Sequence, residues 1–377
     1  MNLRRLMAVA RKESIHVRRD PRALGISIVL PMFLLLLFGY ALTLDVDHVP
    51  FLVWDQSGTP QSRELISRFE GSAYFTLAGG ASGYRDIEAA VDAGRVMMGL
   101  VIPSDFGRRV AAGRPAEVQV LLDGADSNTA TMVQNYADAV VTAYGQGIQA
   151  RALARATGRS QAAPLDLRTR VWFNTDMESR IAIVPGLIAV IMMIIAALLT
   201  SLTVAREWET GTMEQLVSTP LRGSELIVGK MAPYFVIGMM DMILSVLVGR
   251  YVFHVPFRGS PVLLVGMSAV FLTGTLALGI LISIKAKNQL VASQFAFVVT
   301  FLPAFLLSGF MFDISNMPRA LQIVTYLVPA RYFVNLLRGL FLKGVGVPVL
   351  WSEGVFLVGF AVVMMVLALR SFQKRVG

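Results

Sequence analysis

The sequence has no cysteine and only three histidines, and charged residues are scarce along most of its length. Without cysteine, the chain can hold neither a disulfide nor a thiolate metal site, and it offers no cysteine nucleophile. His16, His48 and His254 lie far apart in the chain, and no His-Glu-x-x-His pattern occurs. We therefore expect no metal site and no catalytic centre of these kinds.

The low share of charge identifies the broad class. Charged residues make up 16% of the 377 residues, hydrophobic residues 55%, and the mean hydropathy is +0.62. This composition indicates an integral membrane protein. The uncharged runs long enough to cross a bilayer are 23–44, 181–205, 259–284, 288–312 and 354–369, and a further run, 231–249, is interrupted by Asp241. We predict six transmembrane helices, the first an uncleaved anchor at 23–44.

Residues 1–22 carry three dibasic pairs spaced seven positions apart, Arg4-Arg5, Arg11-Lys12 and Arg18-Arg19. On a helix this spacing gathers the cations on one stripe, with Leu3, Leu6, Met7 and Ala10 on the other side. The pattern predicts an interfacial amphipathic helix whose cations face lipid headgroups or an acidic partner. A simpler interpretation is that these charges only retain the N-terminus in the cytoplasm.

Basic residues in the short connections predict the orientation. With a cytoplasmic N-terminus, the inner segments carry 15 Lys or Arg residues and the outer short loops carry 6. The excess predicts that both termini and the loop 206–230 lie in the cytoplasm.

The stretch 45–180 is the one long insertion of soluble composition, with 13 Arg, no Lys and 16 Asp or Glu. Its alternating pattern predicts strands near 49–54, 74–77, 97–102 and 117–122, helices near 62–69, 84–93 and 106–112, and a long helix over about 128–156. We predict an extracytoplasmic α/β domain between the first two spans. Since the insertion is acidic, the basic character belongs to the membrane flanks, and we expect no nucleic-acid partner.

The remainder, 181–377, is predicted to be a five-helix membrane domain with an unusual outer segment at 313–348. Apolar pieces too short to cross a bilayer are separated there by Arg331 and Arg338, and Pro329 interrupts them. The pattern predicts one or two short helices that dip into the outer leaflet. A plain amphipathic loop is the alternative.

The loop 206–230 is a charged stretch between two spans. It predicts a short helix over 207–219, a break at Thr219-Pro220 and a second helix start near Ser224. Its end, Gly223 to Lys230, resembles a phosphate-binding loop, but five residues separate the glycines where four are needed, and Met231 stands where Ser or Thr binds magnesium. We expect no nucleotide site on this chain.

Asp241 lies near the middle of the third predicted span, where a carboxylate is costly. It is a candidate proton carrier or a contact for a cationic substrate. Equally, it could be a hydrogen-bonded acid that holds two helices together.

Three stretches together resemble a known family. They are Arg206 to Pro220 with Glu225 and Gly229-Lys230, Phe301 to Phe310 with Asn316 to Pro318, and Pro329 to Phe333 with Arg338-Gly339 and Lys343-Gly344. The combination is similar to the type-two exporter permeases of ATP-binding-cassette (ABC) transporters, in particular the bacterial drug-efflux-like members with a large domain after the first span. Asp313 departs from the pattern, since many relatives have proline there.

The resemblance implies a permease that is not an enzyme by itself. It implies a separate ABC ATPase subunit, which binds ATP and Mg, and a second permease copy, identical or closely related. It also implies a multi-pass protein of the bacterial plasma (inner) membrane that exports a small amphiphilic or drug-like compound. The residues of the loop expected to meet the ATPase are Glu207, Glu209, Gly211, Thr212 and Glu214. Whether a periplasmic adaptor binds 45–180 is left open.

Two other functions are weighed against export driven by ATP. A proton-coupled secondary transporter using Asp241 is the first, but a lone acid and the lack of a visible inverted repeat speak against it. A membrane scaffold that binds a partner through 45–180 is the second.

Overall fold

A computed structural model describes residues 2–20, 25–41, 48–157, 173 and 179–372. The chain divides into two compact units, Leu44–Arg170 and a second that joins Met1–Thr43 to Val171–Gly377. We call them the α/β unit and the helical unit and describe each by itself.

The α/β unit is built on a four-stranded sheet of order β2-β1-β3-β4. The strands are β1 (Val49–Asp55), β2 (Phe75–Gly80), β3 (Met98–Ile102) and β4 (Gln119–Leu122). Strand β1 pairs in parallel with β2 and β3, and β4 runs antiparallel to β3. Each strand predicted from the alternation of apolar residues overlaps one of these four.

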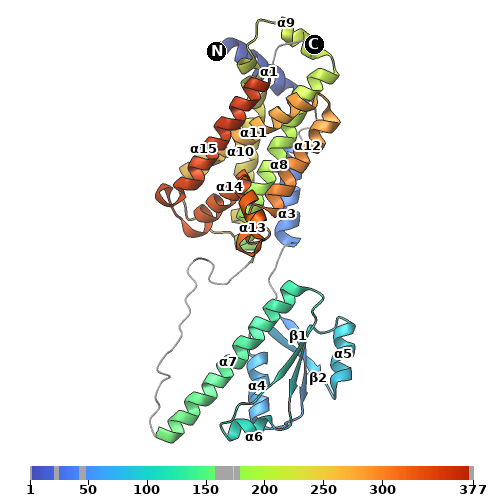
Figure 1. Ribbon diagram of the computed structural model, residues 1–377, viewed down its shortest axis with the longest axis vertical. Helices are drawn as coiled ribbons and strands as arrows, with labels where there is room; N and C mark the ends of the chain where they lie inside the picture. The colour runs from blue at the N-terminus through green and yellow to red at the C-terminus, as the bar shows by residue number, and fades with distance from the viewer. Residues whose placement is uncertain (1, 21–24, 42–47, 158–172, 174–178, 373–377) are drawn as a thin grey trace. The chain divides into compact units, whose positions relative to one another are not determined.

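Helices cover both faces of this sheet (Figure 1). They are α4 (Pro60–Glu70), α5 (Tyr84–Asp92), α6 (Phe106–Ala111) and α7 (Ser127–Thr157). On one face, the ring of Phe51 lies 5.8 Å from that of Phe69 in α4 and 5.9 Å from that of Phe75 in β2. On the other face, Ile87 of α5 packs so closely on Gly99 that a Cβ there would lie 2.3 Å from it. A side chain at this position of β3 would therefore push α5 away from the sheet.

The helical unit contains a helix over all or part of each predicted span. Its elements are α1 (Leu3–Arg19), a π-helical turn (Gly25–Val29) continued by α3 (Leu30–Ala41), α8 (Ser179–Glu209), α9 (Thr212–Ser218), α10 (Gly223–Tyr251), α11 (Pro261–Ala286), α12 (Gln289–Leu306), α13 (Arg319–Thr325), α14 (Pro329–Arg338), a second π-helical turn (Gly339–Lys343) and α15 (Val347–Ser371). Among the described residues, α8, α10, α11, α12 and α15 are long and apolar enough to cross a membrane. The predicted first span is helical over its described part, from Gly25 to Ala41.

Helix α8 lies at the centre of the helical unit, where it packs against α3, α10, α11, α12 and α14. Small residues allow the closest of these approaches: a Cβ at Gly279 of α11 would lie 2.1 Å from the hydroxyl of Thr200. The same hydroxyl donates to the carbonyl of Leu276 at 3.0 Å, and Ser283 accepts two backbone N–H groups of α8. Hydrogen bonds between helices of this kind stabilise packing where no water competes.

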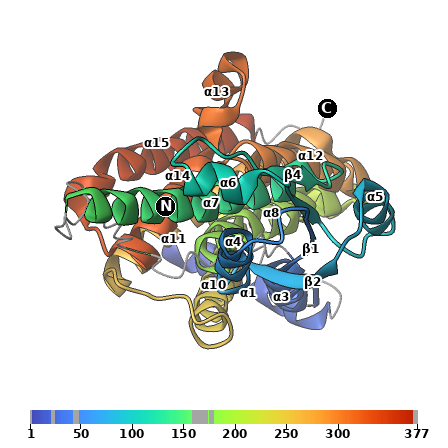
Figure 2. The ribbon, with the colours of Figure 1, turned by 90° about the horizontal axis from the view of Figure 1, so that it is seen from below.

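The predicted short helices of 313–348 are present, and a plain loop is the wrong description. Helices α13 and α14 meet at an angle of 81°, so this pair is either a broken span or a re-entrant loop. Helix α13 stands away from its neighbours in Figure 2, and Ile323 and Leu327 are exposed there. Counted as one span, the pair raises the number of candidate spans among the described residues from five to six.

Candidate functional site

Helices α1 and α9 and the last turn of α15 gather at one end of the helical unit, which we call the α9 end (Figure 1). Helix α8 enters it and α10 leaves it, with α9 between them. The sequence pattern predicts one helix over 207–219, and this is wrong. Gly211 adopts a φ of +72°, which ends α8 and starts α9 as a separate two-turn helix.

The core of this end is a buried group of charges centred on Lys230 of α10. Lys230 is 2% exposed, and its Nζ lies 3.1 Å from a carboxylate oxygen of Glu13 in α1 and 3.1 Å from one of Glu207 in α8. It also donates to the carbonyl of Thr203 at 3.4 Å. The second oxygen of Glu13 accepts a hydrogen bond from the hydroxyl of Tyr234 at 3.2 Å. Three helices are thus joined through one ammonium group.

Glu207 carries two further contacts. Lys12 of α1 donates to its Oε1 at 2.9 Å, and Thr212, the first residue of α9, donates its hydroxyl to Oε2. The two lysines and two carboxylates balance in charge; Lys230 and Glu13 are buried, whereas the side chain of Lys12 is 52% exposed. We call Lys12, Glu13, Glu207, Thr212, Lys230 and Tyr234 the polar junction.

Helix α1 is held against α10 along its length. A Cβ at Gly229 would lie 2.8 Å from the Cβ of Val9, so the two helices cross where one has no side chain. The backbone N–H of Asn2 donates to Glu225 at 2.6 Å. The predicted helix is therefore present, but its apolar side differs from the prediction.

The buried face of α1 is formed by Val9, Glu13 and Val17. Leu3 and Met7, expected on the side away from the cations, are exposed. The reason is that α1 packs sideways on α10, which a seven-residue charge repeat cannot reveal.

Of the five residues expected to meet an ATPase, four lie at least partly at the surface and one, Glu207, is buried. The Glu207 side chain faces inward into the polar junction. Glu209 accepts hydrogen bonds from the backbone and side-chain amides of Gln289, the first residue of α12. Gly211 and Glu214 are exposed, and Thr212 is half-buried.

Asp241 faces the interior of the helical unit, in a narrow cleft between α8 and α10. Its Oδ1 is buried and has no hydrogen-bond partner within the described residues. Tyr234, Met192 and Ser245 are among the lining residues, and the room inside, about 10 Å³, is that of one water molecule. A buried polar atom without a partner is unusual in a folded protein.

At the opposite end, the other predicted residues brace the bend between α13 and α14. Arg338 donates to the carbonyl oxygens of Ala182, Gly309 and Phe310 at 3.3, 3.0 and 3.2 Å. Arg331 lies 4.0 Å from the ring centre of Tyr326, and Pro329 is the buried first residue of α14. These contacts join α14 to the start of α8 and to the turn after α12.

The sequence did not reveal Glu13, Lys12 or Tyr234 as members of the polar junction. An acid within a strongly basic segment was the available signal, because Glu13 stands next to Lys12 where every other charge up to Arg19 is positive.

The apolar spans and the charged junction at one end define a multi-pass helical membrane protein with a built connection between its helices. Comparison with known families then identifies the kind: the model of the "ABC-2 family transporter protein" family matches residues 22–370, and the chain belongs to that family. It is an ABC-2 permease, and the family implies an ABC ATPase as partner.

Curated relatives agree with this assignment. The chain is 37% identical over 377 residues to the probable multidrug ABC transporter permease YbhS of Escherichia coli, covering 100% of this chain and 98% of the relative. It is 30% identical over 352 residues to the probable multidrug ABC transporter permease YbhR of the same organism, covering 93% of each. The inner membrane transport permease YhhJ of Escherichia coli is 28% identical over 300 residues, 78% of this chain and 77% of the relative. These relatives favour the permease of an exporter over a proton-coupled transporter, and they fit a multi-pass protein of the inner membrane.

Proposed function

We propose that this permease exports small amphiphilic, drug-like compounds, driven by an ATPase that binds the α9 end on the cytoplasmic side. The named activities of YbhS and YbhR support the class of substrate. The excess of basic residues in the segments of the α9 end supports its cytoplasmic orientation. The α/β unit then lies outside the cytoplasm, where a periplasmic adaptor can reach it.

The observation that carries the proposal is the chain of contacts from α9 to the spans. Thr212 of α9 binds Glu207 at the end of α8, and Glu207 binds Lys230 near the start of α10. A displacement of α9 is therefore transmitted to α8 by a hydrogen bond and from α8 to α10 by a buried ion pair. In the proposed cycle, ATP-driven closure of the ATPase tilts α8 and α10 together and alternates access to the path.

Within this proposal, Glu209, Gly211, Thr212 and Glu214 form the docking surface, and Glu207 transmits the force behind it. Glu214 is the exposed acid of α9. Two permeases, identical or closely related, pair in the membrane, and two ATPase subunits carry ATP and Mg.

The test distinguishes a loss of ATPase docking from a loss of permease folding. Glu214→Arg should abolish copurification of the ATPase and drug-stimulated ATP hydrolysis while the permease still purifies as a folded protein. Gly211→Leu should do the same, because leucine at a φ of +72° is strained and shifts α9. Glu88→Arg, the same charge reversal at an exposed position of α5, is the matched control. If both variants keep the ATPase and its stimulation, this loop is not the docking surface.

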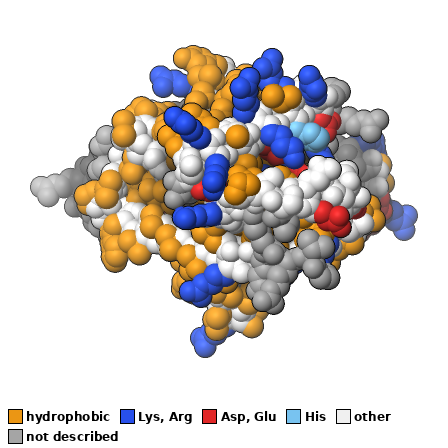
Figure 3. Space-filling model, turned by 90° about the horizontal axis from the view of Figure 1, so that it is seen from above, with side chains coloured by type: hydrophobic (Ala, Val, Ile, Leu, Met, Phe, Trp, Pro, Cys, Tyr) orange, Lys and Arg blue, Asp and Glu red, His pale blue; other side chains and the backbone are white. Residues whose placement is uncertain are grey.

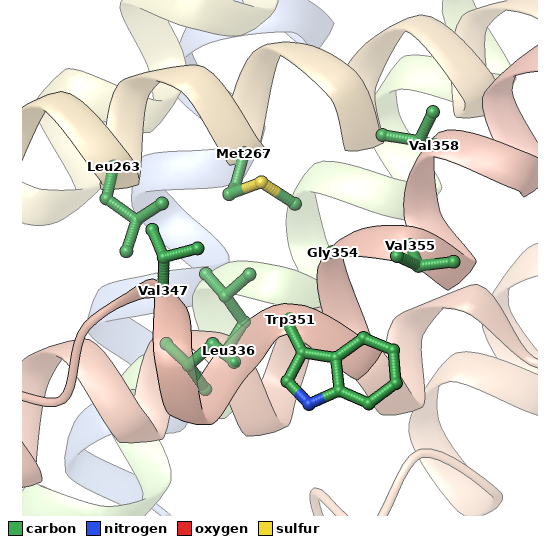
Figure 4. Close-up of a pocket in the computed structure, with 9 residues that line it drawn as sticks. Leu263, Met267, Leu336, Val347, Trp351, Gly354, Val355 and Val358 are labelled. Carbon is green, nitrogen blue, oxygen red and sulfur yellow. The ribbon is translucent and has the colours of Figure 1, made fainter.

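We also propose that the substrate path includes Asp241 and an apolar pocket at the other end of the unit. This pocket, about 350 Å³, lies between α11, α14 and α15 and is lined by Leu263, Met267, Trp351 and Val355, among others (Figure 4). Its apolar wall fits the greasy part of an amphiphile.

A carboxylate in the path favours cations. Asp241→Asn should reduce the export of cationic amphiphiles and spare neutral ones, measured as ATP-driven uptake into inverted vesicles with the ATPase present. Equal loss for both classes, or none, removes Asp241 from substrate recognition.

A further inference from the structure

A cleft at the α9 end lies apart from the polar junction. The last turns of α8, α11 and α15 enclose a cleft of about 510 Å³, with Trp208, Ile284 and Phe372 as its apolar wall and Lys285, Lys287 and Arg370 as its basic rim. Figure 3 looks onto this end and shows Lys and Arg side chains spread across it. The cleft therefore combines an apolar wall with a positively charged rim.

The three cations of the rim have no acidic partner within the described part of the chain. The nearest acids of α8 are occupied elsewhere, since Glu207 binds Lys230 and Glu209 binds Gln289. Three like charges around one cleft repel one another, and an anion placed between them relieves this repulsion.

Lys287 is the C-cap residue of α11 and lines the cleft. Its φ is +54°, in the left-handed region that residues other than glycine rarely adopt. Its Nζ lies 4.9 Å from the ring centre of Trp208. Strain of this kind gathers at functional positions, and the cation is already in place before any ligand arrives.

We propose that this cleft binds the headgroup of an anionic phospholipid from the leaflet that meets the α9 end. The phosphate lies between Lys285, Lys287 and Arg370, because charge-assisted hydrogen bonds from Lys and Arg are the usual recognition of phosphate. An acyl chain follows Ile284 and Phe372 toward the bilayer. The cations lie at the depth of the lipid headgroups, since Lys285 and Arg370 are in the last turns of two helices long enough to cross a membrane.

The shared chemistry is that of a phosphate anion, and the choice of lipid over free phosphate follows from the apolar wall. Native mass spectrometry of the full-length protein in neutral detergent, titrated with phosphatidylglycerol or phosphatidylcholine, measures the preference. We expect one phosphatidylglycerol per chain bound more tightly than phosphatidylcholine.

Removing the cations should reduce this preference by about fivefold for each charge. Lys287→Gly removes one charge and also relieves the positive φ, so its effect does not come from misfolding. The triple variant Lys285→Gln, Lys287→Gln, Arg370→Gln should bind the two lipids alike. The matched control removes three exposed cations of the α/β unit, with Arg63→Gln, Arg85→Gln and Arg95→Gln, and should keep the preference.

Three results overturn the proposal. They are an unchanged preference in the triple variant, an equal loss in the α/β-unit control, and displacement of phosphatidylglycerol by inorganic phosphate at the same affinity, which would make the ligand a free anion.

Discussion

Replacing Lys230 with methionine keeps the length of a buried side chain and removes its charge. In the variant, Glu13 keeps only the Tyr234 hydroxyl among its described contacts, whereas Glu207 keeps Lys12 at 2.9 Å. Glu13 is 4% exposed, so its charge is then buried without a cation. Breaking a buried ion pair from one side costs about 3–5 kcal/mol.

This cost should appear as undocking of α1. When α1 leaves α10, the carboxylate of Glu13 reaches water. The variant therefore favours the state in which α1 is undocked. An energy of this size is roughly a hundredfold or more in the opening equilibrium. Hydrogen exchange of the α1 amides should accelerate by that factor, while the amides at the middle of α8 should be unaffected.

A second variant separates charge from packing. Glu13→Gln in the Lys230→Met background removes the unpaired carboxylate and should restore most of the protection, with a coupling energy of about 2 kcal/mol between the two positions. If the effects of the two substitutions add, or if Lys230→Met leaves α1 as protected as before, the polar junction does not hold α1.

Two further predictions concern packing and pH. Gly229→Leu should lower the unfolding temperature of the purified protein and its stability by about 1–3 kcal/mol, because the new Cβ would lie 2.8 Å from the Cβ of Val9. Val9→Ala in the same protein should restore part of the loss. No rescue would mean that the strain lies elsewhere. In the α/β unit, the hydrogen bond from Arg151 of α7 lowers the pKa of Glu64 in α4. A lowered folded pKa adds stability that is present above the unfolded pKa and is lost as pH falls through the folded value. Glu64→Gln should therefore weaken the protection of α7 amides from hydrogen exchange at pH 7, by less than about 1 kcal/mol because the pair is partly exposed. The difference between the variant and the wild type should vanish in acid. A difference that persists in acid contradicts an ionic origin.

Local patterns in the sequence were sufficient for most of the elements. The uncharged runs correspond to α8, α10, α11, α12 and α15, and the alternation in 45–180 corresponds to the strands of the sheet. Such patterns succeed because burial of an apolar face is decided by residues close in the chain.

The polar junction could not be predicted from such local patterns. Glu13 and Lys230 are 217 positions apart, and nothing near either one says which distant charge it will meet. The same gap explains why Glu207 was expected at the surface: an acid at a helix end is usually solvated, and only the neighbouring helices α1 and α10 turn it inward. For Asp241 the sequence indicated a costly acid in an apolar run without a base, and its role stays a prediction.

The distance between Glu13 and Lys230 also bears on how the protein is made. A chain emerges from the ribosome beginning at its N-terminus, so α1 is complete long before α8 and α10 exist. Until Lys230 has been synthesised, the Glu13 carboxylate has no buried cation to pair with and must stay in water. Helix α1 therefore remains undocked at the membrane surface. Docking of α1 is thus a late step of biogenesis, and it reports that both partner helices have been inserted correctly. A nascent chain stopped before residue 230 should expose α1 to protease, and one stopped well beyond it should not.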